Sequence, residues 1–425
     1  MARRGAQAWR LERLVEPFPA SDVTSRDGAP EMEHALAGLA AADVEAIWAS
    51  VEGLYQTGLH PAIALCVRRH GHVVLDRAIG HAAGNAPDDA LDAELVPATP
   101  RTLFNIFSAS KAVTASVIHL LDERRVLHLD DRVVEYLPEF GRHGKEGTTL
   151  RHLLTHRAGI PSIPNAGEKL DMLGDWDEIV RVLCDLKPVH RAGRQLAYHA
   201  VTGGWVLGEI VRRTTGRTIR DVLRTEICEP LGLHNLGYGV PPERVGDIAR
   251  NAATGPPVVF PATLLLKRAL GVSLADAITI SNDPRFQTSI VPAGNVMATA
   301  WDVCTWLEML LRGGTYGGVR VMEERTVTRA IAEQVYGEID LTLGIPMRYS
   351  MGFVLGGRVL SIYGPGTPRA FGHLGFTTVT CYADPERDIS VCLMTSGKQF
   401  LSPRLWQHLS VLRTINARCV PVGSA

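Results

Sequence analysis

The sequence predicts an α+β protein in which one antiparallel sheet takes strands from both chain ends, is flanked by helices and carries an inserted, mostly helical subdomain. Three observations support this fold class. Strand-like apolar runs occur in residues 43–107, similar runs return in residues 340–417, and the patterns between them, over residues 108–339, are mostly helical. Two separated sets of strands share one core if they form a single sheet. We therefore expect one domain over residues 43–417, with a cleft between its two parts, after a charged extension over residues 1–42.

The first elements expected in the domain are a helix and a β-hairpin. Asp43 is predicted to cap a helix that continues to Tyr55, because apolar residues recur on one face of this segment. Residues 62–67 and 73–75 are apolar runs of strand length, and Gly71 stands between them. A glycine between two such runs is typical of a hairpin turn.

The next segment combines a helical pattern with two reactive side chains. Apolar residues at helical spacing over residues 113–121 predict a buried helix that begins near Ser108. Lys111 follows three positions later, and side chains at i and i+3 project from one face of a helix. A serine hydroxyl becomes a good nucleophile when a neighbouring base removes its proton. Burial would lower the pKa of the lysine amine and make it such a base.

A simpler interpretation of this pair makes Ser108 a helix cap and Lys111 a solvated residue of the first turn. However, the chain contains no other Ser-x-x-Lys sequence. The free N–H groups at a helix N-terminus would also stabilise the anion that forms when Ser108 attacks a carbonyl. We therefore interpret Ser108 as a nucleophile and Lys111 as its base.

The middle of the chain is predicted to consist of short helices and turns. Gly216 closes one helical pattern, and Thr299 begins a capping box before another. Residues 250–292 contain several prolines and show no clear period, so we expect an insertion or a lid there.

Strand patterns return near the C-terminus. Residues 349–355 form one candidate strand, and residues 376–382 and 389–394 predict a second hairpin. A last helix is expected to begin at Ser402, with its leucine side chains turned inward.

Composition argues against several classes of partner. The formal net charge is −1, the pI is near 7.0 and the basic residues are scattered, so we expect no nucleic-acid partner. We find no signal peptide and no apolar run long enough to span a bilayer, which predicts a cytoplasmic protein without stable membrane insertion. Seven dispersed cysteines fit buried thiols in a reducing compartment.

One pair of histidines has the spacing of zinc ligands. His152 and His156 stand at i and i+4, but position 153 is a leucine where a metalloprotease would have its glutamate, and no third ligand is evident. We therefore expect neither a metal nor a cofactor.

Several motifs share their order and spacing with one family. They are Ser108-Ala-Ser-Lys111, the segment at residues 153–159 with Ala158 in place of a serine, Tyr198-His-Ala200, and His373-Leu-Gly375. By these motifs the chain resembles the serine β-lactamase-related hydrolases, a group that includes class C β-lactamases, D-Ala-D-Ala carboxypeptidases and family VIII esterases. The resemblance implies a β-lactamase/transpeptidase-like fold.

Tyr198 corresponds to the tyrosine of the second motif of this family. A phenol has a pKa near 10, and a cation such as Lys111 would lower it. We therefore expect Tyr198 to take the proton of Ser108 and to return it to the leaving group. The alternative is a half-buried tyrosine whose hydroxyl only satisfies a hydrogen bond.

The third motif is expected at the start of a strand, with His373 in the place of the family's lysine. The His373 imidazole is predicted to bind a substrate oxygen and to titrate near neutral pH. Gly375 would let another backbone approach closely. The resemblance implies that the backbone N–H groups of Ser108 and Phe376 form the oxyanion site.

The resemblance also implies an acyl-enzyme formed from a small-molecule substrate. In β-lactamases and carboxypeptidases, the third-motif lysine and the second-motif asparagine contact the substrate, and this chain has His373 and Ala200 instead. We therefore predict a lipase-like carboxylesterase that cleaves esters with short or medium acyl chains. The alternatives are an acyltransferase, a β-lactamase or D-aminoacyl peptidase, and a non-catalytic binding or assembly module. The sequence leaves open whether the protein forms a homo-oligomer.

Overall fold

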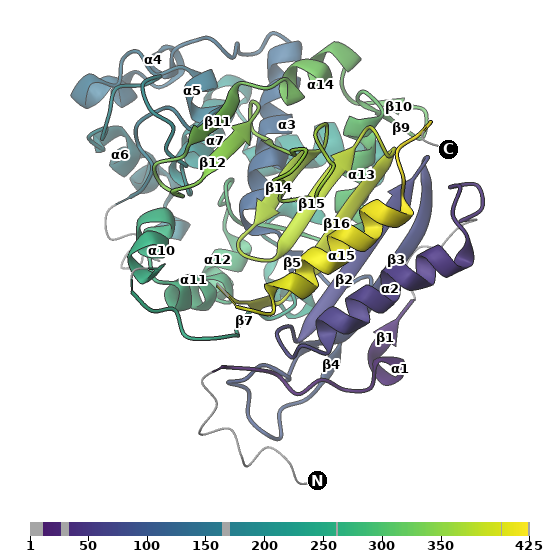
Figure 1. Ribbon diagram of the computed structural model, residues 1–425. Helices are drawn as coiled ribbons and strands as arrows, with labels where there is room; N and C mark the ends of the chain where they lie inside the picture. Colours follow the sequence, from purple (N-terminus) through teal and green to yellow (C-terminus); the bar gives the residue numbers. More distant parts are fainter. Residues whose placement is uncertain (1–11, 27–33, 164–170, 261, 401, 424–425) are drawn as a thin grey trace.

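The computed structural model describes residues 12–26, 34–163, 171–260, 262–400 and 402–423 (Figure 1). Within these residues the main sheet has ten strands, and its neighbouring strands are antiparallel. Strands from both chain ends lie side by side in it, which confirms the predicted fold class. In spatial order the strands are β1 (Thr24–Ser25), β3 (His72–Ala83), β2 (Ala62–Arg69), β16 (Ile389–Thr395), β15 (Val379–Asp384), β14 (Phe371–Gly375), β13 (Val354–Leu355), β12 (Pro346–Tyr349) and β11 (Val335–Ile339), with β4 (Val96–Pro97) paired to β3.

Strands from the N-terminal and C-terminal parts of the chain meet inside the sheet, where β2 pairs with β16 from Ile63↔Thr395 to Arg69↔Ile389. The hairpin of β2 and β3 is confirmed, and its turn holds His70 and Gly71 at φ values of 52° and 85°. Left-handed conformations at both turn residues suit the twist of the two strands.

The two faces of the sheet carry different helices, and β2 shows why. Successive strand residues point to opposite faces. Ile63 and Leu65 pack in one core cluster with α2 and α15, whereas the smaller Ala64 and Cys66 belong to a second cluster that includes α13 and α3. Figure 1 shows α2 and α15 side by side across the near face of the sheet. The bounds are α2 (Ala41–Tyr55), α15 (Leu405–Arg418), α13 (Ala300–Leu311) and α3 (Ser110–Glu123).

The inserted part is mostly helical. Its remaining helices are α4 (Val133–Tyr136), α5 (Leu150–Leu154), α6 (Trp176–Asp185), α7 (Thr202–Thr215), α8 (Ile219–Leu223), α9 (Glu229–Leu231), α10 (Ala262–Leu270), α11 (Leu274–Ser281), α12 (Pro284–Thr288) and α14 (Glu324–Ile331). Of these, α7, α8 and α14 pack against α3, which also contacts β14 of the main sheet. Gly216 ends α7 at a φ of 69°, as its pattern predicted. Residues 250–292, which showed no clear period, contain α10, α11 and α12.

Short strands form smaller sheets beside the main one. A small sheet joins β5 (Phe104–Asn105), β8 (Val296–Ala298) and β6 (Leu236–Tyr238) in that order. A hairpin pairs β9 (Thr315–Tyr316) with β10 (Val319–Arg320), and β7 (Ala252–Ala253) runs parallel to β17 (Gly397–Lys398). The small sheet matters for the site because β5 immediately precedes Ser108.

Two helix ends differ from the sequence prediction. Asp43 is not the cap of α2, because it lies inside the first turn and accepts a hydrogen bond from the N–H of Ala40 at 3.0 Å. α15 begins at Leu405 rather than at Ser402. Of its leucines, Leu412 is buried as predicted, but Leu405 and Leu409 are only partly buried. The buried stripe of α15 runs at i, i+3 and i+4 spacing from His408, which leaves Leu409 on its border.

The strand prediction was wrong at two places near the C-terminus. The segment predicted as one strand over residues 349–355 turns back on itself, so that Tyr349 of β12 pairs with Val354 of β13. Gly352 allows this reversal because its φ is 102°. The predicted strand over residues 376–382 begins only at Val379, after a turn that follows β14.

The described part of the N-terminal extension lies against the domain. Arg13 and Gly255 exchange backbone hydrogen bonds, and β1 pairs with β3. The domain boundaries at residues 43 and 417 stay a prediction. All seven cysteines are buried and free, as expected of structural thiols. Among the described residues, none of the helices combines the length and the hydropathy that crossing a bilayer requires.

Candidate active site

Ser108 lies in a tight turn that leads directly into α3. The turn is a 3₁₀ helix, η2 (Phe107–Ala109), so α3 begins at Ser110, two residues later than predicted. The cause is Phe107, whose φ of 48° is incompatible with a continuous helix and whose N–H donates to Asn105 Oδ1 at 2.8 Å. Left-handed backbone at a bulky residue is strained, and such strain tends to occur at functional sites.

The turn brings the predicted base to the predicted nucleophile. Lys111 Nζ lies 3.2 Å from Ser108 Oγ and 3.0 Å from the carbonyl oxygen of Ala293. Burial lowers the pKa of the Lys111 amine from 10.5 to about 7. Both hydrogen-bond partners of Lys111 in the described part of the chain are uncharged, so neither would restore its charge. A neutral amine at this distance can accept the serine proton near neutral pH.

Tyr198 reaches the same place but does not have the expected acidity. Burial raises the pKa of its phenol, and this effect exceeds the opposite effect of a hydrogen bond with Ser108. The Lys111 amine lies over the face of the Tyr198 ring, 4.7 Å from its centroid. The prediction that Lys111 would lower the pKa of Tyr198 is therefore wrong. Tyr198 keeps its proton, and its hydroxyl can relay or donate a proton rather than act as the first base.

The backbone of Tyr198 is held by an aspartate that the sequence analysis missed. Asp340 is fully buried, and its Oδ1 accepts hydrogen bonds from the N–H groups of Tyr198, Thr342 and Leu343 at 2.9 to 3.1 Å. It lies 142 residues from Tyr198. An aspartate after a strand reads as an ordinary turn residue, so no local signal could have identified this role.

The third motif lies at the end of a strand rather than at its start, because residues 373–375 are the last three of β14. His373 Nδ1 donates to the carbonyl oxygen of Leu374 at 2.7 Å. Burial lowers the pKa of His373 to about 3, so the imidazole is neutral at pH 7. The prediction that it titrates near neutral pH is therefore wrong. With its proton on Nδ1, His373 can offer only an acceptor at Nε2, which is buried and has no partner among the described residues.

Gly375 and Phe376 place the end of β14 against the turn that carries Ser108. A Cβ on Gly375 would lie 2.1 Å from the carbonyl oxygen of Ile106, so only glycine permits this approach. Phe376 follows at a φ of 44°, and its ring stacks on Phe107 with centroids 5.0 Å apart. Two strained phenylalanines therefore flank Ser108, one on each contributing segment.

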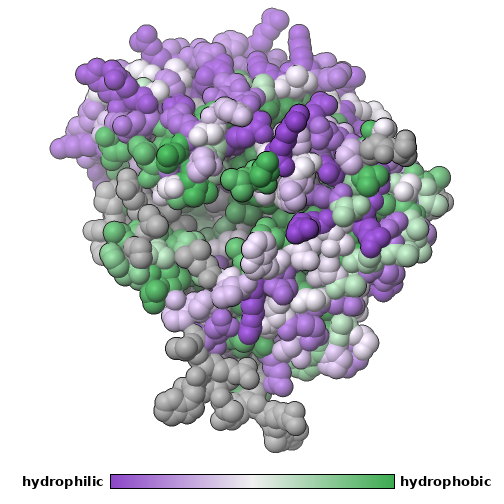
Figure 2. Space-filling model, viewed as in Figure 1, coloured by the Kyte–Doolittle hydropathy of each residue, from purple (hydrophilic) through white to green (hydrophobic). Residues whose placement is uncertain are grey.

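Ser108 opens onto an apolar pocket of about 180 Å³. The pocket wall has no charged side chain in the part of the chain that the structure describes. Figure 2 shows hydrophobic residues in and around a recess on the face where α10, α11 and α12 approach the sheet. The predicted lid region supplies part of the wall through Val272, Ala277, Ile280 and Phe286.

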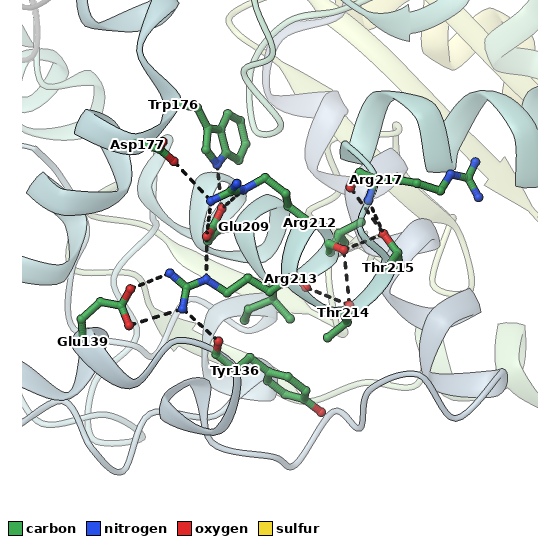
Figure 3. Close-up of polar contacts among 12 residues, drawn as sticks. Tyr136, Glu139, Trp176, Asp177, Glu209, Arg212, Arg213, Thr214, Thr215 and Arg217 are labelled. Carbon is green, nitrogen blue, oxygen red and sulfur yellow. Dashed lines mark hydrogen bonds and ion pairs between the residues drawn. The ribbon is translucent and has the colours of Figure 1, made fainter.

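A buried carboxylate, Glu209, holds together two helices at one wall of the pocket, and Figure 3 shows its polar contacts. Glu209 of α7 is fully buried and accepts hydrogen bonds from Trp176 Nε1 at 2.8 Å and from the Nε atoms of Arg212 and Arg213 at 2.7 Å. Burial would raise the pKa of Glu209, but these three donors together lower it. Since Trp176 begins α6, the network fixes α6 on α7 and thereby positions Ile179, which lines the pocket.

The histidines at zinc-ligand spacing do not converge on a common point. His152 Nδ1 accepts a hydrogen bond from the N–H of Thr149 at 3.2 Å, whereas His156 is buried with its ring 4.7 Å from that of Tyr198. In the described ranges, no group of three or more His, Cys, Asp or Glu side chains could hold a metal ion.

Comparisons with known proteins identify the family. A family model described as Beta-lactamase matches residues 47–409. The chain is 29% identical over 309 residues to the esterase/beta-lactamase LipL of Mycobacterium tuberculosis, which covers 70% of each chain. It is 31% identical over 208 residues to the esterase EstB of Burkholderia gladioli, a match that covers 45% of this chain and 51% of EstB.

Solved structures show the same fold. A penicillin-binding protein homologue from Caulobacter crescentus superposes with a TM-score of 0.74 at 27% identity, over 90% of this chain and 99% of the homologue. A family VIII carboxylesterase superposes with the same TM-score at 24% identity and similar coverage, 90% and 99%.

Proposed function

Because the chain belongs to the beta-lactamase family, we propose that it is a serine hydrolase that cleaves carboxylic esters through an acyl-enzyme on Ser108. Its relatives include proteins named as esterases, which supports this class of hydrolase. The observation that carries the proposal is the pairing of Ser108 with a buried lysine whose pKa is about 7, at 3.2 Å, beside an uncharged pocket.

In the proposed first step, Lys111 takes the proton of Ser108 while Ser108 Oγ attacks the ester carbonyl. The N–H groups of Ser108 and Phe376 are proposed to stabilise the oxyanion. The proton then passes from Lys111 to the leaving alcohol, with the Tyr198 hydroxyl as the relay. This role replaces the earlier expectation of Tyr198 as the base, because a phenol with a raised pKa is a poor base in its protonated form. Water attacks the acyl-enzyme in the second step, with Lys111 as the base again.

The pocket favours an apolar acyl group of limited length. By the measure in which one water takes about 10–15 Å³, a pocket of about 180 Å³ has room for roughly 12 to 18 non-hydrogen atoms. This size suits short or medium acyl chains better than a long fatty acid. An apolar wall also gives no compensation for burying a charged acyl group.

The same residues make β-lactams and D-alanyl peptides poor substrates. Such substrates carry a carboxylate, and a neutral His373 offers it no positive charge. Ala200 lines the pocket with a methyl group where the family motif has an amide side chain. Losing these polar contacts should cost affinity for a substrate that needs them.

The proposal is tested by hydrolysis of p-nitrophenyl acetate, butyrate, octanoate and palmitate, with nitrocefin alongside. Wild type, Ser108→Ala and the control Ser50→Ala are compared, because Ser50 lies in α2 and its hydroxyl donates to the Ile47 carbonyl of the same helix. We expect ester turnover that disappears in Ser108→Ala and persists in Ser50→Ala, with nitrocefin nearly unchanged.

Other outcomes would redirect the assignment. Wild-type ester turnover by Ser108→Ala would refute it, and nitrocefin turnover comparable to that of the esters would support a β-lactamase instead. Product transfer to an added alcohol in place of water would support an acyltransferase. A wild-type protein that a fluorophosphonate probe does not label would support a non-catalytic module.

A further inference from the structure

A second, smaller cavity borders Lys111 and shares no lining residue with the apolar pocket at Ser108, which is called the acyl pocket below. Its volume is about 30 Å³, and its polar wall residues are Lys111, Thr114, His156 and His199, while Gly203 of α7 supplies bare backbone. Ser108 and Tyr198 line the acyl pocket but not this cavity. A polar space of this size can hold one water molecule, provided that two or more polar groups bind it.

The Lys111 amine has fewer partners than its charged form requires. Its two hydrogen-bond partners in the described residues are Ser108 Oγ at 3.2 Å and the Ala293 carbonyl at 3.0 Å. When Ser108 gives up its proton, the O–H bond breaks, a third N–H bond forms on Nζ, and the resulting ammonium has three donors. One of them then needs an acceptor, and Lys111 borders the small cavity.

The histidines in the cavity wall have tautomers that their neighbours determine. His199 Nε2 accepts a hydrogen bond from the N–H of Ile160 at 3.2 Å, so the proton of the neutral ring is on Nδ1. Burial lowers the pKa of His199 to about 3, which keeps the ring neutral. Its Nδ1 is buried beside the Ala197 backbone, but the geometry of that contact leaves the N–H without a well-aligned acceptor in the described structure. A buried N–H without an acceptor is costly, and a water oxygen would satisfy it.

The wall also offers an acceptor. Thr114 Oγ1 donates its own hydrogen to the Pro292 carbonyl at 2.6 Å, and it lies 2.7 Å from the Tyr238 hydroxyl, which must then be the donor of that pair. A hydroxyl oxygen has a second lone pair, which can accept one more hydrogen bond.

We propose that this cavity binds one water molecule, which serves as the third hydrogen-bond partner of Lys111 during proton transfer. The water accepts from Lys111 and from His199 Nδ1, and it donates to Thr114. It stabilises the ammonium that forms when Ser108 is deprotonated, and it does so without contact with the substrate. This inference rests on the proposed function, in which Lys111 is the base.

Gly203 provides a way to remove the water without changing any polar group. A Cβ at Gly203 would lie 3.8 Å from its nearest neighbours, His199 Cβ and the Leu153 carbonyl oxygen, so an alanine fits. Because Gly203 lines the cavity, its methyl group would take up part of the small space proposed for the water. The matched control is Gly53→Ala, which also lies inside a helix but has no heavy atom within 4 Å of the added Cβ.

Without the water, the ammonium form of Lys111 loses a partner, so its pKa falls further and the amine becomes a weaker base. We expect Gly203→Ala to lower the plateau of kcat/KM about tenfold or more and to move the acidic limb of the pH profile to lower pH. Its melting temperature should not fall below that of the wild type, since alanine replaces glycine in a helix. Gly53→Ala should keep both the plateau and the limb.

The ionisable side chains that face Lys111 do not add a titration of their own to the kcat/KM profile near pH 7. Burial keeps them neutral near pH 7, because it lowers the pKa of the three histidines and raises the pKa of the tyrosine. These side chains are His156, His199, His373 and Tyr198.

A high-resolution crystal structure of the wild type gives the second measurement, which is independent of activity. An ordered water within hydrogen-bond distance of Lys111 Nζ would support the inference, and a dry cavity would overturn it. A wild-type pH profile in Gly203→Ala would also overturn it. If Ser108→Ala kept its activity, the proposed function itself would fail, whereas an inactive Ser108→Ala beside an unaffected Gly203→Ala would reject only the water.

Discussion

The pH dependence of ester hydrolysis is the sharpest test of the role proposed for Lys111. Burial lowers the pKa of this amine from 10.5 to about 7, a difference that corresponds to about 5 kcal/mol. At pH 7.5, an amine with a pKa of 10.5 would be neutral in about one molecule in a thousand, whereas with a pKa near 7 roughly three molecules in four are neutral. Burial thus raises the population of the competent base several-hundred-fold.

We therefore expect kcat/KM to reach a plateau above about pH 8 and to fall about tenfold for each pH unit well below 7. The assay is hydrolysis of p-nitrophenyl butyrate between pH 5 and 9, with the spontaneous rate subtracted at each pH. At pH values below the pKa of Lys111, the amine is protonated and cannot accept the proton of Ser108. The loss of activity should therefore appear in kcat/KM for every ester.

Lys398 provides the matched control for this fall of kcat/KM at acidic pH, which is called the acidic limb. Burial also lowers its pKa to about 7, but its amine contacts the Thr395 carbonyl and the Phe107 ring rather than Ser108. The limb should therefore persist in Lys398→Met and disappear with the activity in Lys111→Ala. A flat profile from pH 5 to 9 in the wild type, or a limb that moves with Lys398 instead, would refute the assignment of Lys111 as the base.

Three further predictions concern stability and substrate range. The Lys398 amine holds its proton up to about pH 10.5 in the unfolded chain but only below about pH 7 in the folded protein. Lys398→Met should therefore stabilise the protein by a few kcal/mol at pH 6, and urea titrations should show that this gain shrinks as the pH rises towards 10. Glu209→Gln should lower the free energy of unfolding by about 1–3 kcal/mol, more than the control Glu229→Gln at an exposed ion pair, in the same titrations. Ala277→Trp should narrow the acyl pocket and lower kcat/KM for p-nitrophenyl octanoate about tenfold or more while acetate hydrolysis changes little; equal losses for both esters would contradict the pocket assignment.

Features that depend on neighbouring residues could be predicted from the sequence. The Ser108–Lys111 pair is separated by three positions, so the first turns of a helix bring the two side chains together even though a 3₁₀ turn replaces the predicted α-helical start. The hairpin around Gly71 and the end of α7 at Gly216 are likewise set by short-range backbone geometry.

Properties that depend on burial could not be predicted in the same way. Tyr198 was expected to be acidic because a lysine stands near it, but its pKa is raised because the completed fold removes it from water. The same desolvation keeps His373 neutral. A sequence motif states which residues meet, but it does not state how much solvent remains when they do.

The groups that complete the site come from segments far apart in the chain. The carbonyl of Ala293 reaches Lys111 across 182 residues, and a carbonyl has no sequence signature because every residue carries one. Asp340 reaches the backbone of Tyr198 across 142 residues, and Gly375 packs on Ile106, which lies two residues before Ser108.

In the proposed mechanism, Lys111 can act as a base only in the completed fold. Its low pKa results from burial, and that burial needs α3 of the inserted part, the segment of Ala293 and the end of β14 together. If any of these contacts opened, water would reach the amine, its pKa would rise towards 10.5, and Ser108 would lose its proton acceptor at neutral pH. The activity is therefore expected to be lost in denaturant before the bulk of the sheet unfolds. Inactivation that follows the far-ultraviolet circular dichroism at every urea concentration would contradict this coupling.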